Sequence, residues 1–147
     1  MKKQNIVLGM MGILLFSLLF SILLASRDMD IRKSGSLWAR IESNGTIRIN
    51  GSMVGEFERG GKIRKGGSLV GEIEENGTIR KNGSVIGEIE QNGTIRKNGS
   101  IIGEIENNGI IRKHGSVWGE AENCCSNYLE LRQVTGVLVF FDSNFFQ

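Results

Sequence analysis

The chain has 147 residues, with 18 Lys and Arg against 16 Asp and Glu, giving a formal net charge of +2. This length suits one small domain with appended segments, and the charge is too near neutral to indicate a nucleic-acid partner. One His and two adjacent Cys provide no spacing typical of a metal site, so we expect no metal and no cofactor. Glycine supplies 21 residues and proline none, so the glycines are expected to mark turns or repeats.

The N-terminal segment, residues 1–26, has a short basic lead and then an apolar run without charge over residues 6–25. As a helix, this run spans about 30 Å, the thickness of a bilayer's hydrocarbon core. Both candidate cleavage sites, after Ala25 and after Ser26, place a bulky Leu at the −3 position, which disfavours cleavage. We therefore expect contact with a membrane through residues 6–25 as an anchor, with a cleaved export signal as the alternative. Either outcome places residue 27 onward outside the cytoplasm, as an anchored or a secreted domain.

Residues 27–35 are predicted to be a linker, and a sixteen-residue repeat follows. The repeat occupies 44–58, 60–74, 76–90, 92–106 and 108–122 without insertion or deletion, and residues 36–42 supply half a unit before it. One arginine recurs in the same frame of every unit, at Arg48, Arg64, Arg80, Arg96 and Arg112. Because unbroken spacing means that each unit makes the same contacts, we expect a single repeat domain over residues 36–122.

Each unit has two turn signals six residues apart, as at Asn76-Gly77 and Asn82-Gly83. Asn-Gly between runs of alternating apolar residues predicts a β-hairpin. A three-residue loop at the first signal sets Ile73 opposite Ile79, which matches apolar with apolar, whereas a two-residue loop sets Ile73 opposite Arg80.

The same three-residue loop at the second signal sets Ile79 opposite Val85, so we predict this loop type at both turns. Its glycine requires a positive φ. The expected turn glycines are Gly45, Gly51, Gly61, Gly67, Gly77, Gly83, Gly93, Gly99, Gly109 and Gly115.

Alternation along the strands then predicts the core. The expected core residues are Ile47, Met53, Phe57, Ile63, Leu69, Ile73, Ile79, Val85, Ile89, Ile95, Ile101, Ile105, Ile111, Val117 and Ala121. The opposite face carries Arg and Glu, with single apolar residues at Val54, Val70, Ile86, Ile102 and Trp118. A glycine within each longer strand, at Gly55, Gly71, Gly87, Gly103 and Gly119, is interpreted as a hinge between hairpins.

The repeat G-E-I-E-x-N-G-T-I-R-K-N-G-S-x-I, behind an apolar leader and before a Phe-rich tail, resembles the bacterial five-fold beta-flower proteins. The resemblance covers about residues 35–147. It implies an all-β domain of five hairpin petals around a pseudo-five-fold axis, in an exported protein. It implies no established activity and no catalytic residue. A parallel β-solenoid with sixteen residues per coil is the rival fold.

The C-terminal segment, residues 123–147, is hydrophobic and departs from the repeat. Residues 131–145 fit an apolar helical stripe, whereas residues 137–141 also fit a buried strand, and periodicity does not decide between them. We expect this segment to pack onto one end of the flower as a hydrophobic cap, as terminal elements of repeat proteins do. A docking surface for a membrane or a partner is the functional alternative.

The arginine ring, defined by Arg48, Arg64, Arg80, Arg96 and Arg112, is the candidate binding feature. Its structural interpretation is cross-strand ion pairing, such as Glu72 with Arg80 and Glu88 with Arg96, worth about 0.2–1 kcal/mol each. Every unit carries the same carboxylates, whereas a glycosidase needs two carboxylates in different environments. We therefore expect no catalytic residue and no enzyme activity.

Two further features stand outside the repeat pattern. Cys124 and Cys125 are adjacent, so they could bind a soft metal or bond to each other, but such cysteines are more often unpaired or link two chains. In an oxidising compartment, an exposed pair favours disulfides between chains. His114 takes a turn position that is Asn in neighbouring units, and no nucleophile is held near it by spacing.

These observations predict a non-enzymatic, anchored or exported β-repeat protein with a structural or interaction role. The alternative is a binding module outside the cytoplasm that engages a peptide or a glycan through its charged face. The sequence identifies neither partner.

Overall fold

The structure, a computed structural model, describes residues 27–147. The predicted anchor or signal over residues 6–25 lies outside the described residues. Within residues 27–147, no helix combines the length and the apolarity needed to cross a bilayer.

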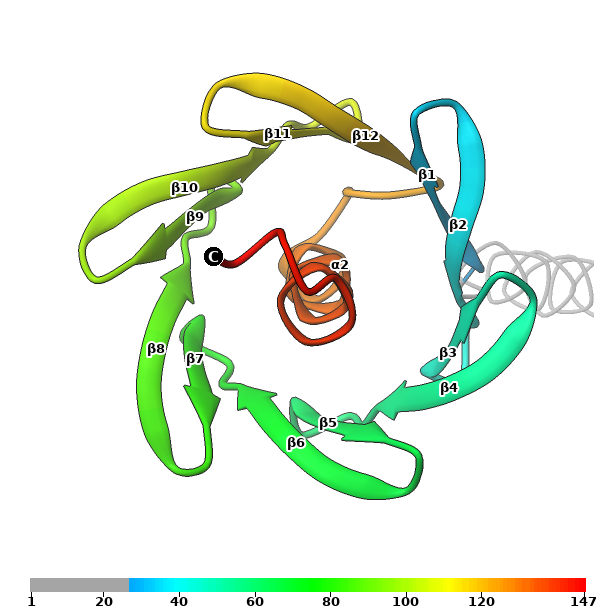
Figure 1. Cartoon of the computed structure of the whole chain (residues 1–147), viewed down its shortest axis with the longest axis horizontal. Coiled ribbons are helices and arrows are strands. Elements are labelled where there is room, and N and C mark those ends of the chain that lie inside the picture. The colour runs from blue at the N-terminus through cyan, green and yellow to red at the C-terminus, as the bar shows by residue number, and fades with distance from the viewer. Residues whose placement is uncertain (1–26) are drawn as a thin grey trace, which may run out of the picture.

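The described chain folds into a closed antiparallel barrel of twelve strands with one helix along its axis (Figure 1). The elements are β1 (Met29–Lys33), β2 (Ser36–Ile41), β3 (Thr46–Ile49), β4 (Ser52–Phe57), β5 (Lys62–Lys65), β6 (Ser68–Ile73), β7 (Thr78–Lys81), β8 (Ser84–Ile89), β9 (Thr94–Lys97), β10 (Ser100–Ile105), β11 (Ile110–Lys113), β12 (Ser116–Glu122) and α2 (Tyr128–Phe141). Each strand pairs with its neighbours in sequence, and β1 pairs with β12. Antiparallel pairing throughout excludes the parallel solenoid.

The barrel contains six hairpins, so the expected five-fold arrangement is wrong. The segment 27–35, expected to be a linker, contains β1, which joins β2 to form the additional hairpin. β1 also closes the ring, because Ile31 lies opposite Ala121 of β12. Closure removes the two strand edges that a five-hairpin arc would leave unpaired.

The three-residue loops at the first turn of each unit are confirmed. Ile73 lies opposite Ile79, the Gly77 N–H donates to the Glu74 carbonyl at 2.9 Å, and Gly77 has φ +91°. The second turn is different from the expectation, because Lys81 pairs with Ser84 across a two-residue loop. Both loop residues, Asn82 and Gly83, have positive φ, which is the type I′ geometry that matches strand twist.

A β-bulge in each hairpin accounts for the error in the second turn. Ile79 lies opposite Gly87 and Arg80 opposite Val85, so Ile86 is the extra residue. The bulge reverses the inside–outside alternation near the hairpin tip. The residues expected in the core but exposed instead are Met53, Leu69, Val85, Ile101 and Val117, at 54–65%.

The side chain that follows each of these exposed residues packs against the core instead, as Val54, Val70, Ile86, Ile102 and Trp118 do. The other ten expected core residues are buried, at 0–3% exposure. The predicted inward face is therefore correct between the three-residue loops and the bulge of each hairpin. It is wrong between the bulge and the two-residue turn.

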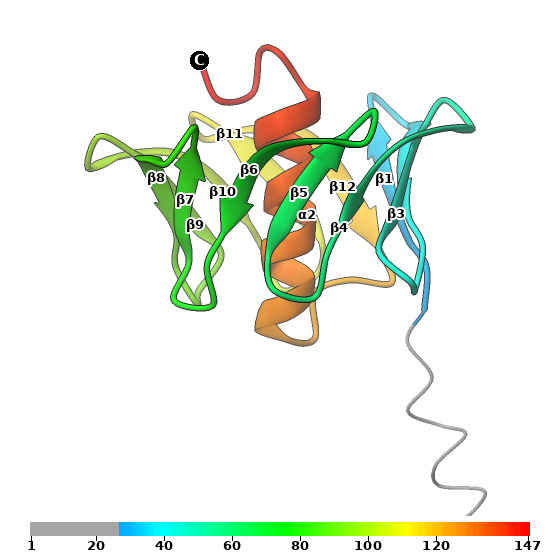
Figure 2. The ribbon, with the colours of Figure 1, turned by 90° about the horizontal axis from the view of Figure 1, so that it is seen from below.

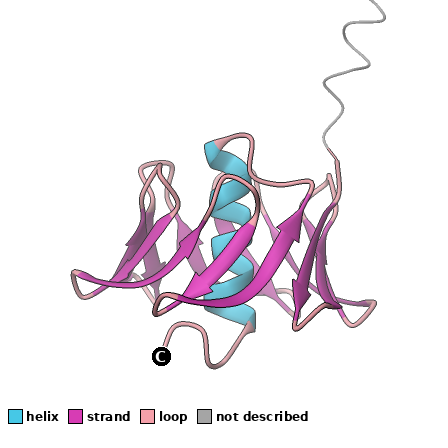
Figure 3. Cartoon of the chain, turned by 90° about the horizontal axis from the view of Figure 1, so that it is seen from above, coloured by secondary structure: helices cyan, strands magenta, loops and turns pink. Residues whose placement is uncertain are grey.

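The C-terminal segment fills the barrel and does not cap its end. Figures 2 and 3 show α2 running through the ring of strands, with the chain end emerging beside the two-residue turns. Val134, Val137 and Leu138 of α2 are fully buried, at 0% exposure. A twelve-stranded barrel is too wide for its own side chains to fill, so the helix supplies the missing core.

Two hydrogen bonds fix α2 to barrel carbonyls. The Tyr128 hydroxyl donates to the Ile89 carbonyl at 2.6 Å, and the Arg132 guanidinium donates to the Ile73 carbonyl at 2.5 Å. Both carbonyls lie next to three-residue loops, so the helix begins at that end of the barrel.

The glycines within the longer strands each lie against a backbone carbonyl of the next strand, and four of the five also leave room for aromatic side chains of the C-terminal segment. A Cβ added at Gly71 would collide with the Phe140 ring, one at Gly55 with Phe141, and one at Gly87 with Phe146. These glycines therefore permit close approach of the helix and tail to the barrel wall.

We predict that Leu138→Ala lowers the free energy of unfolding by about 2–5 kcal/mol, because it opens a cavity between α2 and the barrel. Leu129→Ala in the same helix is the matched control, since Leu129 is 44% exposed; its change should stay within about 0.5 kcal/mol. Urea unfolding followed by circular dichroism measures both. Equal, small effects of the two substitutions would contradict a helix buried in the barrel.

Candidate functional site

The arginine ring lies on the outer surface of the barrel and is fully ion-paired. Each guanidinium bonds the glutamate six residues earlier: Arg48 Nε–Glu42, Arg80–Glu74 and Arg96–Glu90 at 2.5 Å, and likewise Arg64–Glu58 and Arg112–Glu106. The Nη1 of each arginine donates to the carbonyl of a turn glycine, as Arg96 Nη1 does to the Gly99 carbonyl at 3.1 Å. Each arginine therefore ties one hairpin to the preceding loop.

Of the two ion pairs expected by name, Glu88 with Arg96 is present as a long contact and Glu72 with Arg80 is not formed. Glu72 lies opposite Arg80 in backbone register, but the ion pair is made by Glu74. Arg96 contacts Glu88 at 3.9 Å as well as Glu90 at 2.5 Å. Glu72 is thus left facing the groove between hairpins, and Glu88 lines the next such groove with only the long contact to Arg96.

Arg32 is a sixth member of the ring that the sequence patterns above did not assign. It lies sixteen residues before Arg48, and Ile31 lies sixteen before Ile47, so the period itself contained the signal. The turn signal of this unit is weaker, because Ser34-Gly35 replaces Asn-Gly. Arg32 bonds Glu122 at 2.7 Å across the β1–β12 seam, and this carboxylate raises the pKa of the guanidinium.

The first hairpin also has a cross-strand ion pair at a position where three of the other hairpins pair Thr with Glu. Arg40 takes the strand position at which the other units have the Glu of Gly-Glu. Asp30 lies opposite it in register, and Arg40 Nε lies 2.6 Å from Asp30 Oδ1. The hydrogen bond from Arg40 lowers the pKa of Asp30. Arg40 and Arg48, which oppose each other in register, therefore each have their own carboxylate.

Grooves on the outer surface separate adjacent hairpins. Three of them have volumes of about 350, 230 and 340 Å³. The groove beside β8 is lined by Val85, Glu88, Arg96 and the Asn98-Gly99 turn. The groove beside β6 repeats these types with Leu69, Glu72, Arg80 and Asn82-Gly83, and the groove beside β2 has Leu37, Arg40 and Arg48.

The ten expected turn glycines all have positive φ, between 78° and 94°. They shape the hairpin ends and, with the neighbouring Asn, the edges of the grooves. His114 is part of one such turn, at φ 47°, and is exposed. It lines none of these three grooves.

A second polar region lies inside the mouth of the barrel, at the end with the two-residue turns. The lysine rim is defined as Lys33, Lys65, Lys81, Lys97 and Lys113, the residue before the turn in five of six hairpins; Ile49 takes the sixth position. Lys33 bonds Asp142 at 2.7 Å, Lys97 donates to the Phe146 carbonyl at 2.8 Å, and Lys113 donates to the Asn144 carbonyl.

Asp142 organises the tail at this mouth. Its carboxylate accepts from the backbone N–H groups of Asn144 and Phe145, both at 2.8 Å. Burial acts to raise the pKa of Asp142, but the hydrogen bonds from Lys33 and from these N–H groups together outweigh it, so the pKa lies below its usual value. The resulting turn returns Phe145 to the core and sets it 5.5 Å from the Trp118 ring.

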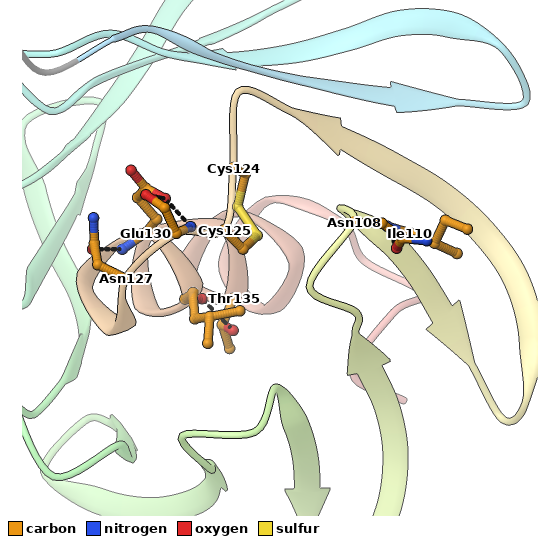
Figure 4. The surroundings of a disulfide bond; sticks show 9 residues. Asn108, Ile110, Cys124, Cys125, Asn127, Glu130 and Thr135 are labelled. Atoms are coloured by element: carbon orange, nitrogen blue, oxygen red, sulfur yellow. Dashed lines mark hydrogen bonds between the residues drawn. A yellow bond between two sulfur atoms is a disulfide. The ribbon is translucent and has the colours of Figure 1, made fainter.

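Cys124 and Cys125 form a disulfide with each other in the connection between β12 and α2 (Figure 4). The next turn starts the helix: Asn127 accepts from the Glu130 N–H at 3.0 Å, and Glu130 accepts from the Ser126 N–H at 2.6 Å. This reciprocal capping fixes where α2 enters the barrel.

Among residues 27–147, no cluster of three His, Cys, Asp or Glu side chains is arranged to hold a metal. The grooves supply guanidinium, carboxylate, amide and aliphatic groups, which suit recognition of a polar ligand. In comparison with known proteins, no family model, no curated protein and no solved structure matches this chain.

We predict that Asp142→Asn lowers the free energy of unfolding at pH 7 by about 1–2 kcal/mol, toward the low end because Lys33 is 39% exposed. The folded-state pKa of Asp142 is lowered, so its stabilisation is complete above the ordinary carboxyl pKa of about 3.9 and disappears as the pH falls through the folded-state value.

The measurement is urea unfolding of both proteins between pH 3 and 8. The difference should be constant from pH 5 to 8 and shrink below pH 4. Glu75→Gln, at an exposed loop residue, is the control and should change stability by less than about 0.5 kcal/mol. A difference that grows on acidification would contradict the assignment.

Proposed function

We propose that this protein is a non-catalytic binding module that engages a glycan through the grooves between its hairpins, outside the cytoplasm. The observation that carries the proposal is the repetition of one groove. The grooves beside β6 and β8 each combine an exposed aliphatic side chain, a surface carboxylate, an arginine and an Asn-Gly turn. Repeating grooves of one chemistry suit a polymer of repeating units.

The side chains of the groove favour a sugar over a peptide. Arginine, glutamate and asparagine supply donors and acceptors for hydroxyl groups, and Leu69 or Val85 supplies a small apolar surface. A peptide most simply adds as a strand to a free sheet edge, and the closed barrel has none. Volumes of about 230–350 Å³ lie below or at the lower end of the range of about 300–1,000 Å³ for ligand pockets, which suits one small unit per groove.

Multivalency compensates for weak single sites. A polymer held by several grooves gains avidity of about 10²–10⁴ over one groove without any new contact. The arginine ring keeps the grooves in register, because each arginine bonds both a loop glutamate and a turn carbonyl.

Location and family belong to the same proposal. The uncharged run over residues 6–25 supports an anchor or an export signal, and the disulfide suits an oxidising compartment. Tandem hairpins around an axis support a relationship to the beta-flower proteins, with six petals in this chain. The repeated Arg–Glu pairs are equivalent to one another, whereas acid–base catalysis requires two groups in different environments. This equivalence supports a role without catalysis.

The test uses the full chain in phosphatidylcholine nanodiscs, screened against an array of neutral and acidic polysaccharides and a peptide library. For a retained polysaccharide, Glu72→Ala with Glu88→Ala should weaken binding at least about tenfold, because two grooves lose their carboxylates.

Glu75→Ala is the matched control, since Glu75 is an exposed loop carboxylate that lines neither groove; it should bind as the wild type does. Retention of peptides alone, or wild-type glycan binding by the double variant, would overturn the proposal.

A further inference from the structure

The mouth of the barrel contains a cavity distinct from the outer grooves. Its volume is about 480 Å³, and it is lined by Lys65, Lys81 and Lys97 together with Ile86 and the aromatic tail. The lysines alternate with the outward arginines along their strands, so their side chains reach the inside of the rim.

The floor of this cavity is apolar. Phe140 and Phe141, at the end of α2, and Phe146, in the tail, line it and are each partly buried. Their rings lie against Gly71, Gly55 and Gly87, so the barrel wall fixes their positions. An apolar floor below a charged rim matches a ligand with one apolar and one charged part.

The charge at the rim is positive and only partly balanced. Lys33 is paired with Asp142, and Lys97 donates to a neutral carbonyl. Within residues 27–147, Lys65 and Lys81 make no ion pair with a side-chain carboxylate, although Lys65 lies 5.5 Å from the Phe141 ring. Lys81 is exposed at the edge of the cavity. The ammonium groups of Lys65 and Lys81 thus face the cavity. Its acidic side chain, Asp142, is paired with Lys33 and accepts from backbone N–H groups of the tail.

We propose that this cavity binds a single-chain anionic amphiphile, such as a fatty acid, with its carboxylate at Lys65 and Lys81 and its alkyl chain on Phe140, Phe141 and Phe146. A simple inorganic anion would use the lysines and leave the aromatic floor without a role. A neutral alcohol would use the floor and leave the ammonium groups without a partner. The combination selects for both parts of the ligand.

The cavity opens at the end of the barrel opposite to residue 27. Residue 27 enters the barrel at the end with the three-residue loops, because Met29 pairs with Ile41 next to such a loop. The cavity opens at the other end, where the chain ends beside the two-residue turns (Figure 2). The cavity and residue 27 therefore lie at opposite ends of the barrel.

The test titrates ¹³C-carboxyl octanoate into the full chain in phosphatidylcholine nanodiscs and follows the carboxyl resonance, with a parallel titration into empty nanodiscs. Wild-type protein should show saturable binding that exceeds the binding to empty nanodiscs. Lys65→Gln with Lys81→Gln should weaken binding at least about tenfold.

Arg59→Gln with Lys62→Gln is the matched control, because it removes the same charge from exposed residues at the opposite end of the barrel. This control should bind octanoate as the wild type does, and circular dichroism should show both variants folded. Octanol and acetate should each compete at least about tenfold less well than octanoate.

Four results would overturn the proposal. The first is binding no greater than that of empty nanodiscs, and the second is equal loss in both double variants. The third is competition by acetate or inorganic phosphate as effective as that by octanoate, which would show a simple anion site. Retained binding in Lys65→Gln with Lys81→Gln would likewise remove the lysines from the site.

Discussion

Packing of α2 against the inner wall of the barrel is the interaction on which the structure depends. Twelve strands enclose an axis too wide for their own inward isoleucines to fill, and an unfilled interior would cost both dispersion and hydrophobic free energy. The helix provides the second layer of the core, and its buried Val134, Val137 and Leu138 meet isoleucines from several hairpins. A repeat that cannot bury its face alone thus uses a non-repeated segment to complete its core.

The same construction gives the two ends and the outer wall of the barrel different chemistry. The end with three-residue loops receives the start of the helix, held by Tyr128 and Arg132. The other end holds the aromatic tail, which is surrounded by the lysine rim. Asp142 fixes the tail by its ion pair with Lys33 and by accepting from the Phe145 N–H. The outer wall repeats the arginine-bound grooves. Because Phe140 and Phe141 belong to both the core helix and the rim cavity, the fold positions that candidate site directly.

The repeat period made much of this fold predictable. The spacing placed the arginines, the turn glycines and the three-residue loops, since pairing apolar with apolar left one register for Ile73 and Ile79. The bulge at Ile86 was not visible, because an extra residue changes no spacing when every unit contains it. Arg32 fits the period but precedes a weaker turn sequence. The helix was ambiguous because its stripe also fits a strand, and its position inside the barrel follows from the size of the ring, which depends on the sixth hairpin.

The most direct test of the central helix is methyl NOE spectroscopy of the full chain in nanodiscs with labelled Ile, Leu and Val. α2 contacts β2, β6 and β8, which lie on different sides of the ring (Figure 1). We expect NOEs from the methyl groups of Val134, Val137 and Leu138, taken together, to isoleucines on all three strands, including Ile41, Ile73 and Ile89. NOEs to strands on one side only, or to residues at one end of the barrel alone, would contradict a helix that fills the interior.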